Sequence, residues 1–501
     1  MPESNELETF SVQKNPHHWD TLKARRLFPT GGITDWGMKT LRNGLEGHVG
    51  TVLLEPRYIC KDHRNLFSNF YSKKTVPGSS VCARLHFFQH PDVNGHDFLF
   101  HPEQFAETYM GYSVIRDVSE RCLGRTVIDP YKVGRKLTDG FYSLRTSFRT
   151  HLNGRLITAH GYPYLSQDTD ATVCAHATLW GVCRYLSERH SNYAELLPYD
   201  LVRLTATTTG RVIPYRGMTY QDYSKILSDF GCHPVIFYTK DTDTQQELNP
   251  ADFKDLYSYV ESGLPVLASF GGHVVALIGH TIDYDRQLNP DADLLVDSST
   301  FLKQFIVVDD NFFPYRLLGY PNDPANYATN AGFPKPYSIN SIITVVCPLP
   351  EKVYLPAVRA RELTHLYLKD LLNRYGRAAF SPEATDEPLV CRLFVTTGSS
   401  LKKRKLETSA TGAGGVDQLC AFVANLHLPH FVWMLEVSPL SRYRQRQATA
   451  EIVLDATANR FDKHAFVYAR AGAHLLLDGQ HRTLQNAPVT FAQFTHNLGE
   501  A

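Results

Sequence analysis

Three residues in the middle of the chain have the types and the order that nucleophilic catalysis requires: Cys174, His273 and Asp309. A cysteine thiolate attacks a carbonyl carbon, a histidine moves the proton, and an acid orients the imidazole ring. Each residue alone is weak evidence, because a lone cysteine is usually a small buried apolar residue. The prediction depends on their order and on the element that each one opens or closes.

Cys174 follows the polar segment 167–173 and opens a stretch whose apolar residues recur at helical spacing, with Thr172 as the candidate N-cap. The N-terminus of a helix favours a thiolate, because its unpaired N–H groups carry partial positive charge. Gln167 is expected to fold back and donate a hydrogen bond to the oxyanion, together with the backbone N–H of Cys174. The alternative for Gln167 is a surface glutamine in a turn.

His273 follows a Gly-Gly pair at the start of an apolar strand, where glycines allow a substrate backbone to come close. His280 closes the same strand at an odd offset, so its side chain should face the other side of the sheet. His176 lies two residues after Cys174 on the expected helix and should point away from it. His273 is therefore the expected base.

A second apolar strand ends at Asp309, Asp310 and Asn311. A carboxylate there can accept a hydrogen bond from the second ring nitrogen of His273 and fix its tautomer. We expect Asp309 in this role, with Asp310 and Asn311 as alternatives. The non-catalytic interpretation is a strand followed by an Asx turn.

A zinc site is the competing interpretation of the cysteine helix. Its ligands would be Cys174, His176, Cys183 and His190. The spacing is poor, because residues 174 and 176 fall on different faces of a helix. We therefore expect no metal and no cofactor.

The elements that must position these residues are expected in residues 155–350. Helical periodicity and β-branched apolar runs distinguish the two kinds of element. Helices are predicted from 174, at 220–230 and at 253–261, and strands at 234–238 (buried), 265–270, 274–278 and 305–308. Because the helices largely precede the strands, we expect an α+β fold rather than alternating βαβ units.

Two mixed α/β regions of unknown role flank this one, which divides the chain into 1–154, 155–350 and 351–501. The N-terminal region is predicted to have strands at 51–60, 112–118 and 125–129 and a hairpin at 147–160 around Asn153-Gly154. The C-terminal region is predicted to have a helix at 358–375 and strands at 389–395, 430–437, 450–454, 465–470 and 473–477. Residues 408–415 are predicted to be a flexible loop and 402–405 a solvated basic segment.

Composition and charge limit the function classes. The chain has 501 residues, 43% of them hydrophobic, and 51 basic residues balance 51 acidic ones. A neutral chain has no global field for nucleic acid or anionic membranes, so neither partner is expected. The first residues form no apolar signal segment, and nine scattered cysteines without a CxxC pair favour reduced thiols. We expect a soluble cytoplasmic protein.

The order of these motifs resembles papain-like cysteine peptidases, in particular the compact bacterial branch that includes double-glycine leader (bacteriocin-processing) peptidases. The stretches that carry the resemblance are Gln167, CAHA at 174–177, HVVALIG at 273–279 and VVDD at 307–310. Three features depart from the family pattern: Ala175 replaces a glycine, Asp310 replaces a proline, and residues 281–304 lengthen one connection. The resemblance covers about residues 160–345.

The resemblance implies a papain-like core and assigns a role to each motif. Cys174 would be the nucleophile, His273 the base, Asp309 the orienting acid and Gln167 the oxyanion donor. The expected activity is hydrolysis of a peptide or isopeptide bond through a thioester, with a protein or peptide as substrate. Two alternatives use the same core: acyl transfer to an amine, as in transglutaminase-like enzymes, and an inactive papain-fold binding module.

Overall fold

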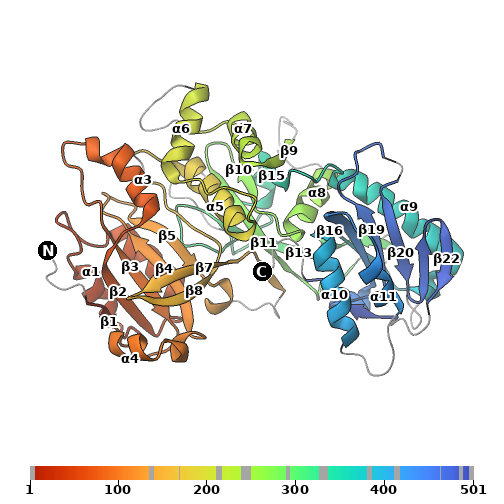
Figure 1. Ribbon diagram of the computed structural model, residues 1–501, viewed down its shortest axis with the longest axis horizontal. Coiled ribbons are helices and arrows are strands. Elements are labelled where there is room, and N and C mark those ends of the chain that lie inside the picture. Colours follow the sequence, from red (N-terminus) through yellow and green to blue (C-terminus); the bar gives the residue numbers. More distant parts are fainter. Residues whose placement is uncertain are drawn as a thin grey trace.

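The computed structural model describes residues 6–134, 140–168, 170–209, 217–238, 250–288, 294–326, 337–380, 386–410, 418–462, 464–484 and 489–495. Within them the chain is a mixed α/β structure with three large sheets. The sheets follow one another along the long axis of the molecule, from the N-terminal part through the middle to the C-terminal part (Figure 1). No helix among these residues is both long and apolar enough to cross a membrane.

The N-terminal sheet has five antiparallel strands in the order β1-β2-β3-β4-β5. The strands are β1 (Glu8–Phe10), β2 (Thr51–Tyr58), β3 (Cys82–Phe88), β4 (Tyr109–Ile115) and β5 (Leu123–Ile128). The helices of this part are α1 (His18–Ala24), α2 (Asp35–Leu45), α3 (Lys61–Asn69) and α4 (Gly95–Phe100). The strands expected at 51–60, 112–118 and 125–129 correspond to β2, β4 and β5.

A separate hairpin follows, formed by β7 (Thr146–Leu152) and β8 (Arg155–Gly161). Its two turn residues, Asn153 and Gly154, have φ angles of 46° and 81°. Two consecutive left-handed residues match the twist of a two-residue hairpin, and Asn-Gly is the sequence that adopts them most easily. The hairpin predicted at 147–160 is therefore confirmed.

The middle sheet is antiparallel in the order β14-β13-β11-β10-β15-β9, with β6 paired to β11. Its strands are β6 (Phe141–Ser143), β9 (Cys232–Tyr238), β10 (Val266–Ser269), β11 (Val274–Ile282), β13 (Leu302–Val308), β14 (Arg316–Gly319) and β15 (Thr344–Pro350). The helices are α5 (Cys174–Arg189), α6 (Pro198–Thr209), α7 (Tyr220–Phe230) and α8 (Pro250–Glu261). The helices expected from 174, at 220–230 and at 253–261 correspond to α5, α7 and α8.

Both faces of the middle sheet are buried along its central strands β10, β11 and β13, which explains why these strands are apolar without alternation. Along β11, Val274, Ala276 and Ile278 belong to the core that includes residues of α5 and α7. Val275 and Leu277 belong to the core that includes residues of α8 and the C-terminal sheet. Successive side chains of a strand point to opposite faces, so this one strand contributes to two cores.

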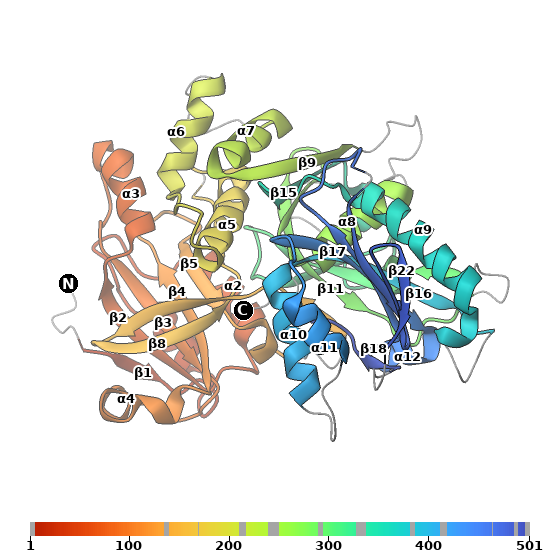
Figure 2. The same ribbon diagram turned by 45° about the vertical axis from the view of Figure 1, so that its right-hand side comes forward.

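The C-terminal sheet has the order β12-β16-β17-β19-β20-β21-β22. Its strands are β12 (Leu295–Asp297), β16 (Leu389–Thr397), β17 (Phe431–Pro439), β19 (Ala450–Asp455), β20 (Phe466–Ala471), β21 (His474–Leu477) and β22 (Gln480–Thr483), and β18 (Gln447–Ala448) pairs with β23 (Phe491–Ala492) outside it. The helices are α9 (Ala357–Tyr375), α10 (Gly398–Ala410), α11 (Gln418–Asn425) and α12 (Leu440–Arg444). Figure 2 shows α9 lying along this sheet, and α10 and α11 side by side.

Three sequence expectations were wrong in detail. The strand expected to be buried at 234–238 is β9, which lies at the edge of its sheet and is mostly half-exposed. Of the loop expected at 408–415, residues 408–410 continue α10 and the rest lie outside the described residues. The basic segment 402–405 is not fully solvated, because Lys405 is buried and its Nζ lies 2.6 Å from Oε2 of Glu451.

Two short strands cross the boundaries expected at residues 154 and 350. β6 joins the middle sheet through β11, and β12 pairs in parallel with β16 of the C-terminal sheet. An α+β fold was expected, and the structure is a mixed α/β chain. Its neighbouring parts share hydrophobic cores. The division into three domains stays a prediction.

Candidate active site

Cys174 is the first residue of α5, and Val173 rather than Thr172 occupies the N-cap position. The prediction for Thr172 was wrong, because its hydroxyl accepts a hydrogen bond from the backbone N–H of Asp168 at 3.1 Å. Cys174 is half-buried, whereas the other cysteines whose side chains the structure describes are buried. Cys174 is therefore the described thiol that a reagent or substrate reaches most easily.

The loop that leads into Cys174 is held by Asp168. One carboxylate oxygen of Asp168 accepts from the backbone N–H groups of Asp170, Ala171 and Thr172 at 3.0, 2.9 and 2.8 Å. Asp168 is 2% exposed, so these bonds are shielded from water. No role was expected for Asp168, although an aspartate in a polar turn commonly accepts hydrogen bonds from the backbone N–H groups that follow it.

His273 lies at the end of the tight β10–β11 hairpin. The turn residues Gly271 and Gly272 have φ angles of 71° and 117°, which residues with a Cβ rarely adopt. The hairpin is closed by a hydrogen bond from the N–H of Phe270 to the carbonyl of His273 at 2.9 Å. The hydroxyl of Thr178 on α5 donates to the carbonyl of Val274 at 3.2 Å, which links the cysteine helix to the histidine strand.

Asp309 follows β13, which pairs with β11, so the sheet brings the aspartate beside the histidine. Nε2 of His273 lies 3.0 Å from Oδ1 of Asp309. The same oxygen accepts from the backbone N–H and from Nδ2 of Asn311, at 2.9 and 3.0 Å. Of the three residues left open by the sequence, Asp309 is thus the direct partner, and Asn311 supports it. Nδ2 of Asn311 also lies 3.3 Å from Nε2 of His273.

His273, Asp309 and Cys174 form one coupled unit. Burial alone would lower the pKa of His273, but the charge and hydrogen bond of Asp309 outweigh it, and the hydrogen bond with Cys174 acts in the same direction, so the pKa is raised well above its usual value. Burial would raise the pKa of Asp309, but His273 and Asn311 lower it. The unit therefore favours an imidazolium, with Nε2 on Asp309 and Nδ1 left for the thiol.

The carboxyl of Asp310 forms no hydrogen bond with the imidazole of His273 among the described contacts, unlike that of Asp309. The backbone carbonyl of Asp310 accepts a hydrogen bond from the hydroxyl of Tyr164 at 3.0 Å. Burial and the neighbouring charge of Asp309 raise the pKa of the Asp310 carboxyl to about 7, although His273 and Arg121 act in the opposite direction. At pH 6 this carboxyl is mostly protonated.

Gln167 is brought to the histidine side of the site. Its Nε2 donates to Oδ1 of Asn311 at 3.4 Å. The same oxygen accepts from the guanidinium of Arg121, which comes from the connection between β4 and β5 in the N-terminal sheet. Arg121 was missed by the sequence analysis, because it lies 190 positions from Asn311 and no local motif marks it.

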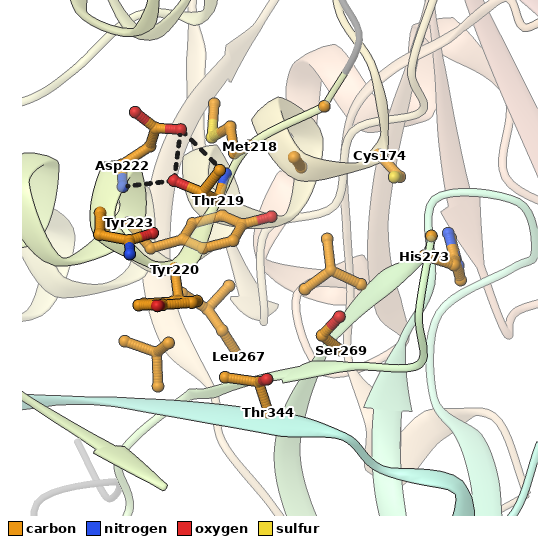
Figure 3. Close-up of a pocket in the computed structure, with 16 residues that line it drawn as sticks. Cys174, Met218, Thr219, Tyr220, Asp222, Tyr223, Leu267, Ser269, His273 and Thr344 are labelled. Carbon is orange, nitrogen blue, oxygen red and sulfur yellow. Dashed lines mark hydrogen bonds between the residues drawn. The ribbon is translucent and has the colours of Figure 1, made fainter. Parts of the chain in front are cut away.

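A cavity of about 850 Å³ opens beside Cys174 and His273. It lies between α7 and the β10–β15 part of the sheet, and Figure 3 shows Cys174 and His273 together at one side of it. Most of its other side chains are apolar or uncharged. They include Met218, Tyr220, Tyr223, Leu267, Ser269, Thr344 and Val346. The carboxylate of Asp222 also lines the cavity but accepts from both the backbone and the hydroxyl of Thr219.

The other two histidines lie outside this arrangement. Nε2 of His280 contacts Oε2 of Glu261 on α8 at 2.5 Å, so His280 belongs to the opposite face of the sheet, as predicted. Nδ1 of His176 accepts from the N–H of Val173 at 3.4 Å, and its Nε2 lies 3.2 Å from the hydroxyl of Thr205. Burial lowers the pKa of His176 to about 4, which keeps the ring neutral.

In the part of the chain that the structure describes, Cys174, His176, Cys183 and His190 do not come together as a candidate zinc site. Among the described residues, the group of side chains that could hold a metal ion is His273, Asp309 and Asp310, whose ligand atoms lie within 4.8 Å of one another. His176 and Cys183 are not part of it, and Cys183 is fully buried within the core. A cation bound to the first group would have to replace the 3.0 Å contact between His273 and Asp309.

Comparison with protein-family models, curated proteins and solved structures found no match to this chain.

Proposed function

We propose that the chain is a cysteine hydrolase that cleaves a peptide or isopeptide bond with Cys174, His273 and Asp309. The observation that carries the proposal is the continuous contact from the accessible thiol through the imidazole to a buried carboxylate, at the edge of a large cavity. A thiol with no catalytic role needs neither an imidazolium partner nor access to such a cavity.

The proposed reaction begins with a thiolate of Cys174 beside the imidazolium of His273. The thiolate of Cys174 adds to the carbonyl carbon, and the π electrons move onto the carbonyl oxygen. His273 then gives its proton to the leaving amine as the C–N bond breaks, which leaves a thioester on Cys174. Water, deprotonated by the now neutral His273, adds to the thioester and releases the acid and the thiolate. Asp309 holds the ring in one orientation throughout.

The arrangement supports a papain-like core. A helix opens with the nucleophile, an antiparallel sheet carries the base at the start of one strand, and the acid follows the neighbouring strand. In this proposal the cavity holds the substrate, and its lining favours an uncharged, apolar side chain next to the scissile bond. Transfer of the acyl group to an amine other than water would use the same three residues, and no contact in the site separates it from hydrolysis.

The reactivity of Cys174 tests the proposal directly. With limiting iodoacetamide near pH 6, roughly two units below the pKa of a free thiol, we expect selective labelling of Cys174, mapped by mass spectrometry. In His273→Ala the labelling rate at Cys174 should fall at least about tenfold, because the positive partner is gone. His190→Ala is the matched control, since His190 lies at the opposite end of α5 from Cys174 and does not line the cavity.

Slow and uniform labelling of all cysteines in the folded protein would contradict the proposal. It would favour a binding module that keeps the fold without the chemistry. Equal rates in the wild type and in His273→Ala would also contradict it.

A further inference from the structure

The oxyanion of the proposed reaction needs a hydrogen-bond donor from the cavity side. Gln167 was expected to supply it, but its amide nitrogen donates to Asn311, and Gln167 is not among the residues that line the cavity. A carbonyl that approaches Cys174 from the cavity therefore meets another set of polar atoms. The backbone N–H of Cys174, at the start of α5, is one donor, and a second one is required for a full oxyanion site.

Tyr223 is the polar side chain that best fits this requirement. It is 6% exposed, lies on α7 and lines the same cavity as Cys174 and His273. In Figure 3 its ring extends from α7 across the cavity, with the hydroxyl toward Cys174. The ring of Tyr220, one turn earlier on α7, lies away from Cys174, and its hydroxyl forms a hydrogen bond with Tyr238 instead.

The helix that carries Tyr223 is fixed at its start. Thr219 and Asp222 form a capping box. The carboxylate of Asp222 accepts from the backbone N–H of Thr219 at 2.8 Å, and the backbone N–H of Asp222 donates to the hydroxyl of Thr219 at 3.3 Å. Such a box holds the first turn of a helix rigid. Tyr223 follows directly, so its ring has a defined position without a substrate.

We propose that Tyr223 is a catalytic residue of the site, whose hydroxyl donates a hydrogen bond to the oxyanion formed when Cys174 attacks a carbonyl. This inference rests on the proposed function and adds a donor that the sequence did not indicate. As the C–S bond forms, the π electron pair moves onto the carbonyl oxygen, and the phenol stabilises that charge without losing its proton. Gln167 then acts as a positioning residue for Asn311.

The protonation of the phenol agrees with this role. Burial, the charge of Cys174 and the charge of Asp222 all raise the pKa of Tyr223 well above its usual value. The hydroxyl therefore remains a donor at every pH at which the thiolate reacts. A donor that is already in place beside the thiol needs little reorganisation when the negative charge appears.

A peptide aldehyde tests the donor without knowledge of the natural substrate. The thiolate adds to the aldehyde carbon and forms a hemithioacetal, whose oxygen occupies the oxyanion position. Iodoacetamide alkylates the same thiol by displacing iodide and places no such oxygen there. We would use acetyl-Leu-Leu aldehydes ending in leucinal, phenylalaninal, glycinal or argininal, and measure how each protects Cys174 from iodoacetamide.

Tyr223→Phe should raise the aldehyde concentration needed for half-protection by about tenfold to a hundredfold, the usual order for the loss of one oxyanion donor. Its labelling rate with iodoacetamide should stay within about twofold of the wild type, because alkylation does not use the donor. Tyr193→Phe is the matched control, since it removes the hydroxyl of another buried tyrosine, which stacks on Phe230 of α7 but does not line the cavity. Its half-protection concentration and its labelling rate should both stay unchanged.

The outcomes separate this inference from the proposed function. Equal protection of the wild type and Tyr223→Phe would overturn the role of Tyr223 and leave the reactive thiol standing. Normal labelling of Cys174 with no protection by any of the aldehydes would also overturn it, because no oxyanion site would then exist beside the thiol. Failure of Cys174 to react selectively in the wild type would contradict the proposed function itself.

Discussion

At the scale of single residues, the site depends on how Asp309 controls the charge of His273. Asp309 is fully buried and shares one oxygen between the imidazole and two N–H groups of Asn311. In the absence of this carboxylate, burial would lower the pKa of His273, opposed only by the hydrogen bond with Cys174 and the charge of Asp310. The histidine would then be neutral where Cys174 needs a positive partner.

Asp309→Asn should therefore slow the labelling of Cys174 by iodoacetamide at pH 6, by about tenfold or more. The sign follows from the pKa of His273, which Asp309 raises, so the imidazolium of the wild type persists above the usual range and that of the variant does not. The difference should shrink near pH 9, where a free thiol ionises without help. The measurement is the labelling rate of Cys174 from pH 5 to 9.

Asp310→Asn is the control for this prediction. Because the pKa of Asp310 is raised to about 7, its carboxyl is mostly protonated at pH 6 and contributes little charge there. Its replacement by an amide should leave the rate at pH 6 close to that of the wild type. If Asp310→Asn slowed labelling as much as Asp309→Asn, the assignment of the orienting acid would be wrong.

At the scale of elements, the cavity is formed by one helix packed over one end of a sheet. α7 contributes the two tyrosines, and Ser269 of β10 and Thr344 of β15 lie opposite one another on the sheet. β10 and β15 are interior strands whose backbone groups pair with neighbouring strands on both sides, so a substrate cannot add to the sheet as a further strand beside them. We therefore expect side-chain fit in the cavity to dominate substrate selection.

Thr344→Trp should test this by filling the cavity. Thr344 is half-buried at the start of β15, so the larger ring is accommodated in the cavity rather than in the core. Labelling by iodoacetamide should change less than about twofold, because the reagent is small, while half-protection by the phenylalaninal peptide should need at least about tenfold more aldehyde. The measurement is the change in the half-protection concentration of the aldehyde divided by the change in the labelling rate with iodoacetamide.

Lys303→Trp is the matched substitution for this experiment. It places the same ring at an exposed position of β13 outside the cavity. An equal loss of aldehyde binding in both variants, or none in Thr344→Trp, would show that the cavity does not hold the substrate.

At the scale of the whole molecule, one hydrogen bond and a network of buried ion pairs join the three parts. Arg121, on the connection between β4 and β5, reaches Asn311 beside Asp309. Arg392 of β16 contacts Glu261 at the end of α8, with Nε to Oε1 at 2.6 Å, and Glu436 of β17 at 2.7 Å. Glu261 also pairs with His280 on the strand that begins after His273. The middle sheet is thus connected to both neighbours.

Arg392→Leu should reduce the stability of the chain by about 3–5 kcal/mol, because it leaves the buried carboxylate of Glu436 without its cation and Glu261 with His280 alone. Burial raises the pKa of Glu436 even though Arg392 opposes it, so the loss of Arg392 should push Glu436 further toward the neutral form. The measurement is the midpoint of urea denaturation, monitored by tryptophan fluorescence.

Lys14→Ala is the comparison, since the pair of Lys14 with Asp92 at 2.6 Å is exposed on both sides and should contribute less than about 1 kcal/mol. Similar midpoints for Arg392→Leu and the wild type would contradict a structural role for the Arg392 network.

The sequence by itself determined the elements and their order. Periodicity, Asn153-Gly154 and the apolar β-branched runs predicted most of the helices and strands of all three regions, because these signals are local. The sequence also proposed Cys174 at a helix start, His273 at a strand start and Asp309 at a strand end, and the structure has each residue in that place. Their catalytic roles stay predictions.

Only the tertiary structure decided which atoms meet. The pairing of β11 with β13 chose Asp309 over Asn311 as the partner of His273, and a contact across 190 positions brought Arg121 to Asn311. The direction of Gln167, the burial of Lys405 and the place of Tyr223 in the cavity depend in the same way on packing between distant segments. Local propensity carries no information about such contacts, because strand order and helix packing arise only when the whole chain buries its apolar surface.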